Sequence, residues 1–178
     1  MTKPRGLSRD LGPFEAELKC CTYHPFLPNF TLGALMVEVD EGRLLAETLD
    51  LYLKDSRLTV LGAFSLRSST SVCETGKNFS DKCPFLKSGR CSIHGFRPST
   101  CSTYVCRSNT GEAGLKAWRT FERQLAKFEW SLANDVAFEI GYTKDELDAT
   151  YSSYEDIKTV YARAYKAAQL TSVRDWDE

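Results

Sequence analysis

The C-terminal third of the chain has apolar residues at the spacing of an amphipathic helix. After Gly114 they recur every three or four residues in one stripe: Leu115, Trp118, Phe121, Leu125, Phe128, Leu132 and Val136. A stripe of this kind normally faces the core of a globular domain. We therefore predict a long helix that packs through the stripe. Gly141 stands where the residue after a helix end often adopts a left-handed conformation.

Two capping boxes follow this helix. Thr143 with Glu146, and Ser153 with Asp156, have the spacing at which a side-chain oxygen and a carboxylate close the start of a helix. The second box precedes an apolar series at helical spacing: Ile157, Tyr161, Ala164 and Ala168. We therefore predict three C-terminal helices that pack as a bundle.

The N-terminal half has weaker periodicity. A short apolar run, Leu35 to Val39, is compatible with a buried strand or with the lead into a helix. We predict a helix over residues 41–54, with Asp40 as its cap, because apolar residues then recur at helical spacing. Prolines at 25 and 28 predict a loop before this region. Residues 67–81 are rich in Ser and Thr and also predict a loop.

The segment from Cys83 to Cys106 predicts loops and short turns, since Pro84, Gly89, Gly95 and Pro98 interrupt it. The fold class that follows is mainly α, with a C-terminal helical bundle packed on a loop-rich cysteine-cluster half. The chain has 178 residues and neither an internal repeat nor a low-complexity linker, which predicts a single domain over 1–178. Its cysteine-rich half covers about 20–110 and its helical half about 112–170.

Charge and hydropathy narrow the range of partners. The net charge is −1, which gives no reason to expect a nucleic acid or an anionic membrane as partner. No apolar run approaches the roughly 20 residues of a membrane-spanning helix. Residues 1–12 have no apolar segment of the kind found in a secretory signal. We therefore expect a cytoplasmic protein.

Seven cysteines are many for such a chain. Thiols stay reduced in the cytosol, so a cysteine framework there predicts a metal centre more readily than disulfides. Structural disulfides in an extracytoplasmic protein, and buried inert cysteines, are the alternatives. The odd count leaves one thiol unpaired in any scheme made only of disulfides.

The ligands that we predict are Cys83, Cys91, Cys101 and Cys106, with Cys21 as a fifth. The first four are separated by seven, nine and four residues, which allows the chain to wrap round a centre. Binding energy from such a centre can offset the ordering entropy of a loop. Cys21 is preferred to its neighbour Cys20 because it begins the proline-bounded loop.

Several other residues near the cysteines bear on this centre. Basic side chains outnumber acidic ones between Asp81 and Arg107, and their charge would stabilise thiolates. These side chains are Lys82, Lys87, Arg90, Arg97 and Arg107. A solvated basic loop explains them as well. Pro98 biases Arg97 toward extended geometry, and we predict that Arg97 lies near the thiolates or bonds the surrounding carbonyls. His24 and His94 are further possible ligands, and Cys73 is predicted to be a free thiol.

The ligand spacing also bears on the metal. Structural zinc sites usually draw ligands from Cys-x₂₋₄-Cys pairs, and here the only close pair is Cys101-x₄-Cys106. The wider spacings favour an iron–sulfur cluster, a [4Fe–4S] cluster in particular. Zn²⁺ is the alternative metal.

The motifs Cys83-Pro-Phe-Leu and Cys91-Ser-Ile-His-Gly-Phe-Arg-Pro-Ser-Thr-Cys101 resemble those of a bacterial family. Its members are the cysteine-cluster proteins described as having a zinc- or iron-chelating domain. The resemblance covers roughly residues 20–120 and implies a chelating domain. The upstream cysteine run of the family is reduced here to Cys20-Cys21, and His94 stands where Tyr is usual. A similar cysteine pattern occurs in flagellin lysine methylases, which is compatible with an enzymatic role.

These observations predict a cytoplasmic metal-binding protein whose iron–sulfur cluster serves redox or group-transfer chemistry. The alternative is a zinc-stabilised interaction module without chemistry of its own. We find no phosphate-binding loop, nucleophile elbow or paired-carboxylate site in the sequence. Glu129, Asp135 and Glu139 share the predicted long helix, where a solvated face explains them.

Overall fold

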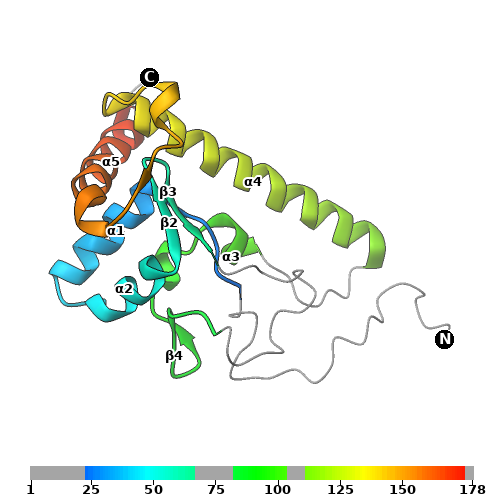
Figure 1. The fold of residues 1–178 in the computed structure, drawn as a ribbon. Helices are drawn as coiled ribbons and strands as arrows, with labels where there is room; N and C mark the ends of the chain where they lie inside the picture. The colour runs from blue at the N-terminus through cyan, green and yellow to red at the C-terminus, as the bar shows by residue number, and fades with distance from the viewer. Residues whose placement is uncertain (1–22, 67–81, 104–110, 175–178) are drawn as a thin grey trace, which may run out of the picture.

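The computed structural model describes residues 23–66, 82–103 and 111–174. Helices dominate this part of the chain, and small antiparallel sheets accompany them (Figure 1). The longer helices are α1 (Asn29–Asp40), α2 (Ala46–Lys54), α4 (Gly111–Glu139) and α5 (Tyr154–Arg174). The predicted fold class is therefore confirmed: the protein is mainly α, with C-terminal helices packed on a loop-rich part that carries cysteines.

A four-stranded antiparallel sheet, in the order β1-β3-β2-β6, packs against the helices. Its strands are β1 (Leu27–Pro28), β2 (Ser56–Thr59), β3 (Gly62–Ser65) and β6 (Thr150–Tyr151). Leu58 in β2 lies opposite Ala63 in β3 on one side and opposite Tyr151 in β6 on the other. Strands of two to four residues are too short to show an alternating pattern, and we did not predict this sheet from the sequence.

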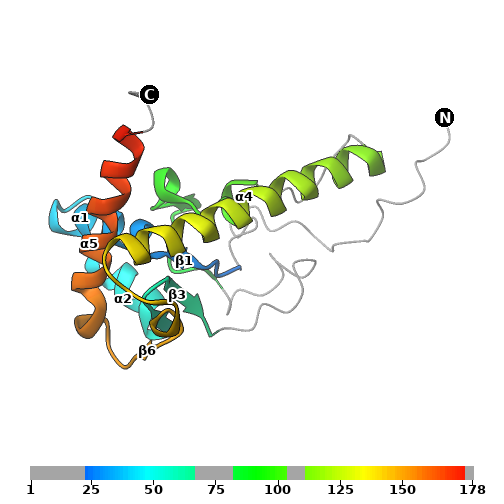
Figure 2. The ribbon, with the colours of Figure 1, turned by 90° about the horizontal axis from the view of Figure 1, so that it is seen from above.

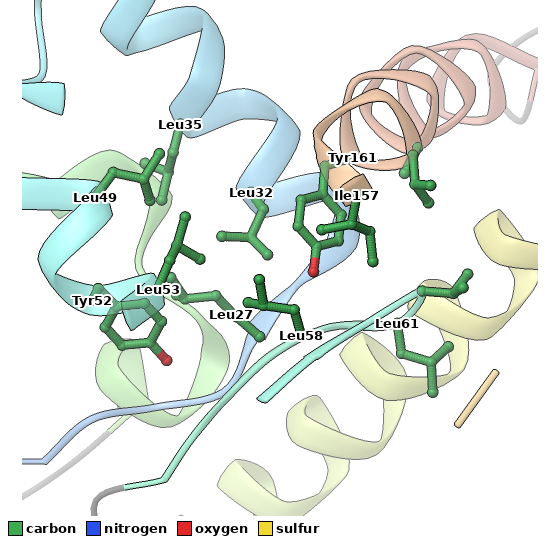
Figure 3. Close-up of a cluster of buried hydrophobic side chains, with 14 of the residues drawn as sticks. Leu27, Leu32, Leu35, Leu49, Tyr52, Leu53, Leu58, Leu61, Ile157 and Tyr161 are labelled. Carbon is green, nitrogen blue, oxygen red and sulfur yellow. The ribbon is translucent and has the colours of Figure 1, made fainter. Parts of the chain in front are cut away.

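The main core lies where α1, α2 and α5 meet the sheet (Figure 3). Apolar side chains from each of these elements are fully or almost fully buried there, and they include Leu32, Leu35, Leu49, Leu53, Leu58 and Ile157. Tyr161 of α5 is buried among them, and its hydroxyl donates a hydrogen bond to the carbonyl oxygen of Thr59 at 3.0 Å. This bond satisfies the only polar atom of that side chain, as burial requires.

Asn29, the first residue of α1, joins three elements. Its side chain is fully buried, and its amide nitrogen donates to the carbonyl oxygens of Val60 at 3.1 Å and Ala133 at 2.9 Å. Its amide oxygen accepts the backbone N–H of Phe30 at 2.8 Å. The start of α1 is therefore fixed to the turn between β2 and β3 and to α4.

Gly33 allows α1 and α5 to pack with their backbones close together. A Cβ atom at this position would lie 2.2 Å from the carbonyl oxygen of Tyr161 and 2.5 Å from the Cβ of Tyr165. Both distances are far below van der Waals contact, so only glycine fits at this crossing.

The helix predicted over 41–54 was wrong in its start. The structure has two helices, α1 ending at Asp40 and α2 beginning at Ala46, so Asp40 closes one helix rather than capping the next. The short apolar run that begins at Leu35 is part of α1. This helix begins directly after Pro28, within the region where the two prolines had indicated only a loop. Gly42 follows the end of α1, where the N–H of Arg43 returns to the carbonyl oxygen of Glu38 at 2.8 Å, a Schellman-type bond that ends the helix.

The predicted end of α4 is confirmed. Gly141 has φ +96°, and Tyr142 donates its N–H to the carbonyl oxygen of Ala137 at 3.1 Å. The N–H of Gly141 also bonds the carbonyl oxygen of Phe138 at 2.9 Å. The two bonds together make a Schellman motif, in which a positive φ at the glycine is required.

The Thr143–Glu146 capping box forms without opening an α-helix, whereas Ser153 caps α5 by accepting the N–H of Asp156 at 3.3 Å. Thr143 donates its backbone N–H to the Glu146 carboxylate at 2.8 Å, yet the turn that follows is a single 3₁₀ turn, η4 (Lys144–Glu146). The predicted middle helix was wrong, because the chain turns instead to pair β6 with β2. Ser153 and Asp156 stand at the start of α5, as predicted, and their side chains are 2.7 Å apart.

The apolar stripe of α4 packs in the core only near its C-terminal end. Val136 is buried, but Trp118, Phe121 and Phe128 are 40%, 49% and 69% exposed. The core-packing prediction was therefore wrong for the N-terminal part of the stripe. Figures 1 and 2 show the reason: α4 meets α1 and α5 at one end and extends away from them at the other.

Candidate metal centre

Cys83 and Cys91 are brought together by a small hairpin. Its strands are β4 (Leu86–Lys87) and β5 (Arg90–Cys91), in which Cys91 lies directly opposite Leu86. The N–H of Leu86 bonds the carbonyl oxygen of Cys83 at 3.0 Å, so the chain turns at Cys83 just before it enters the hairpin. The loop residues Ser88 and Gly89 have φ +47° and +72°, as in a type I′ turn. The turn that we predicted here is confirmed.

The Cys83 thiol faces an apolar environment. Its residue is 9% exposed and belongs to the buried cluster that contains Phe85 and Tyr52. Burial raises the pKa of the Cys83 thiol to about 11, and the nearby Cys91 thiol acts in the same direction, while a backbone hydrogen bond at Phe85 partly opposes them. Cys83 alone is therefore a neutral thiol at physiological pH, and a thiolate there needs a positive partner such as a metal ion.

Cys101 lies on the short helix α3 (Ser99–Thr103), which α4 holds at both ends. The Glu129 carboxylate accepts the Ser99 N–H at 3.0 Å and the Ser99 hydroxyl at 2.7 Å. At the other end, the indole N–H of Trp118 donates to the carbonyl oxygen of Thr103. The position of Cys101 is thus set by α4, although the cysteine belongs to the loop-rich half of the sequence.

Two tyrosines connect the hairpin with α3. Burial raises the pKa of the Tyr52 phenol above its usual range, and the charges of Cys83 and of Cys101 add to this rise. Burial likewise raises the pKa of Tyr23, with contributions from Cys101 and then from Glu122 of α4. Tyr52 and Cys83 also belong to the same buried cluster, so Tyr52 is the side chain through which the charges of Cys83 and Cys101 are linked.

The Tyr52 side chain is held firmly between these groups. Its hydroxyl donates to the carbonyl oxygen of Pro25, and its ring lies 5.2 Å from that of Phe85 and 6.2 Å from that of His24, centroid to centroid. His24 is buried and stacks on Tyr52. His94, the second histidine considered as a ligand, lies in the 3₁₀ turn η3 (His94–Phe96) with an exposed side chain.

The structure brings the predicted ligands together only in part. Cys83, Cys91 and Cys101 are not joined to one another by disulfides. No three histidine, cysteine or acidic side chains of residues 23–66, 82–103 and 111–174 are close enough to form a complete metal-binding group. The other predicted ligands, Cys21 and Cys106, lie outside the described residues, as do Cys20 and Cys73.

Arg97 is half-buried at the junction between η3 and α3. Its Nε is buried and has no hydrogen-bond partner among the described residues, while its carbonyl oxygen accepts the Ser102 hydroxyl at 3.1 Å. Its predicted position beside the thiolates stays a prediction. The basic side chains of the hairpin, Lys82, Lys87 and Arg90, are exposed.

Three residues around this region were not identified from the sequence. Tyr52 packs against Phe85 in the cluster that contains Cys83, and the charge of Cys101 contributes to the raised pKa of Tyr23. A tyrosine in a loop or at helical spacing gives no signal of such a role. Glu129 was read as part of a solvated face, whereas it caps α3. A carboxylate thirty residues from its partner serine cannot be recognised as a cap from local sequence.

The donor set fits a thiophilic metal. Three thiols, one of them buried and protonated without a positive partner, are the ligand type that zinc and iron–sulfur clusters share. Comparisons with protein-family models, curated proteins and solved structures find no match for this chain. None of the helices in the described part of the chain is long and apolar enough to cross a membrane.

Proposed function

We propose that this chain is a cytoplasmic cysteine-cluster protein that binds an iron–sulfur cluster. Cys83, Cys91, Cys101 and Cys106 would be the principal thiolate ligands, with Cys21 as a fifth. The proposal agrees with the resemblance of the Cys83–Cys101 motifs to the bacterial zinc- or iron-chelating family. A nucleic acid or a membrane is not among the partners that we propose.

The observation that carries the proposal is the shared neighbourhood of Tyr52. Cys83 and Cys101 are separated by seventeen residues of the chain, yet the charges of both contribute to the raised pKa of the same buried phenol. Cys91 lies opposite Leu86 in the hairpin and acts on Cys83. Cys83 and Cys101 are thus linked through Tyr52, and Cys91 is linked to Cys83, which supports a common centre.

The remaining predicted ligands begin within reach of this region. Cys21 precedes Tyr23 by two residues, and the charge of Cys101 contributes to the raised pKa of Tyr23. Two residues of extended chain span at most about 7 Å. Cys106 follows the end of α3 by three residues, which span at most about 11 Å. Both lengths allow the thiols to join Cys101.

When bound, a [4Fe–4S] cluster would supply one-electron chemistry or a site for group transfer. The chain's own residues would shape that site. Burial of Cys83 among Phe85 and Tyr52 excludes water from one side, and the exposed basic residues of the hairpin offset the negative charge of the thiolates.

Metal analysis of protein purified without oxygen tests the proposal. We expect brown protein with about four iron and four sulfide per chain, and visible absorption that bleaches on reduction. Colourless protein with stoichiometric zinc would favour the zinc-stabilised interaction module instead. Metal-free protein with its cysteines paired in disulfides would refute the metal centre altogether.

A further inference from the structure

One side of α4 carries no charge over five turns. At 100° per residue, every Lys, Arg and Glu between 112 and 129 falls on the other side of the helix. The part of this face away from α3 consists of exposed small, polar and aromatic residues: Ala113, Ala117, Phe121, Gln124, Phe128 and Ser131. Trp118, about 60° from Phe121, lies at the edge that holds α3. Phe121 and Phe128 are seven residues apart, two turns along one line, and are 49% and 69% exposed.

The described elements leave this face open. The adjoining side of α4 holds α3 through Glu129 and Trp118, and the Trp118 ring lies 5.6 Å from Phe121. Figures 1 and 2 show that this part of α4 extends away from α1 and α5. A charge-free helix face with two phenylalanines in register is typical of a surface that packs against another helix.

A second copy of the chain is a poor occupant on grounds of area. A phenylalanine buries about 150–250 Å², so two half-exposed rings offer about 240 Å² for each copy. A stable interface needs about 800 Å² from each partner. A segment of the same chain needs far less area, because it does not lose the translational freedom of a separate molecule.

The chain outside the described residues includes a suitable segment and enters at the right place. Leu11, Phe14 and Leu18 are spaced by three and four residues. Pro13, followed by Glu15, is typical of a first helical turn. The described chain resumes at Tyr23 and reaches α4 at once, because the Phe26 ring lies 5.4 Å from that of Trp130. The charge of Glu122, near the middle of the exposed part of α4, contributes to the raised pKa of Tyr23.

The connection is long enough to reach the uncharged face. From Leu18 to Tyr23 the chain has five residues, which span up to about 17 Å. A helix with its side chains is about 10–12 Å across. Leu18 can therefore reach the Phe121 side of α4 from the position of Tyr23.

We propose that residues 11–18 dock on the uncharged face of α4, with Phe14 and Leu18 against Phe121 and Phe128. This interaction is independent of the metal centre and would exist in metal-free protein. It would hold the chain just before Cys20 and Cys21 along the same helix that positions Cys101.

Site-specific photocrosslinking of the full chain tests the docking. With p-benzoylphenylalanine in place of Phe121, irradiation should join α4 to the tryptic peptide Asp10–Lys19, and mass spectrometry would identify the product. The same probe in place of Lys127, on the charged side of α4, should give at least tenfold less of it. Equal yields at the two positions, or no product with this peptide, would overturn the proposal.

Mixing ¹⁴N- and ¹⁵N-labelled protein before irradiation identifies the occupant. Products within one isotope support docking inside the chain, whereas mixed-isotope products as the main species would show a second copy and refute it. Replacing Phe14→Ser and Leu18→Ser together should remove the product, while Glu15→Gln with Glu17→Gln should keep it. Circular dichroism would show that both variants retain the helices, and an unchanged product in the serine variant would contradict the proposed contacts.

Discussion

Replacing Glu129 by alanine tests whether α4 holds the helix that carries Cys101. The carboxylate accepts the N–H of Ser99 at 3.0 Å and its hydroxyl at 2.7 Å. Hydrogen bonds to a charged acceptor contribute about 1.5–3 kcal/mol each. Because Glu129 is only partly buried, water replaces part of this contribution. We expect the free energy of opening α3 to fall by about 2–3 kcal/mol.

Amide hydrogen exchange measured by NMR gives this quantity directly. The N–H groups of Cys101 and Ser102 both donate to the carbonyl oxygen of Pro98, at 2.9 and 3.0 Å, so both report the opening of α3. A loss of 2–3 kcal/mol corresponds to about 30- to 150-fold faster exchange. Glu139→Ala, at an exposed position of the same helix, is the matched control. Equal exchange in the two variants would refute the anchoring role of Glu129.

Three further predictions concern the cysteines and the main core. The Cys91→Ser variant should lose the metal and the Cys73→Ser variant should keep it, as elemental analysis would show. The reverse result would make Cys73 a ligand and Cys91 a free thiol. In metal-free protein, alkylation of Cys83 should reach half its maximal rate near pH 11, compared with about 8.5 for an unfolded thiol. Since the pKa of Cys83 is higher in the folded protein than in the unfolded chain, the protonated thiol stabilises the fold below about pH 8.5. This contribution is lost as the pH rises through about 11. An alkylation midpoint of about pH 8.5 would contradict the burial of Cys83. Gly33→Ala should lower the free energy of unfolding by about 1–3 kcal/mol, because the new Cβ would lie 2.2 Å from the carbonyl oxygen of Tyr161. Calorimetry should show a fall in Tm of about 2–4 °C for each kcal/mol lost. An unchanged Tm would exclude this contact.

Features with a local physical cause could be predicted from the sequence. Gly141 ends α4 and Ser153 stands at the start of α5, because a left-handed glycine and a side-chain cap act within a few residues. The turn after Lys87 forms for the same reason. The mainly α character follows from the long periodic segments, which give the strongest signal for an element type.

Features that depend on distant residues could not be predicted. Leu58 and Tyr151 pair across the sheet over a separation of 93 residues, and this pairing replaces the helix expected after Thr143. For the same reason the apolar stripe of α4 was assigned to the core over its whole length. Periodicity shows that a face is apolar, but only the arrangement of the other elements decides which part of it is covered.

For the candidate site, the sequence identified cysteines but not their surroundings. The hairpin places Cys83 near Cys91 by local geometry. The position of Cys101 relative to the hairpin depends on Glu129, which holds α3. The position of Tyr52 relative to the cysteines depends on the packing of α2. Neither contact has a local signal.

The two hydrogen-bonded contacts of α3 with α4 restrict where the sequence can gain or lose residues. Glu129 and Trp118 are eleven residues apart, about 16 Å along the helix, and they bond opposite ends of the five-residue helix α3. One residue added between these positions would rotate one anchor by about 100° relative to the other, so only one could still reach α3. Insertions or deletions in this stretch of α4 should therefore be rarer among natural variants than substitutions.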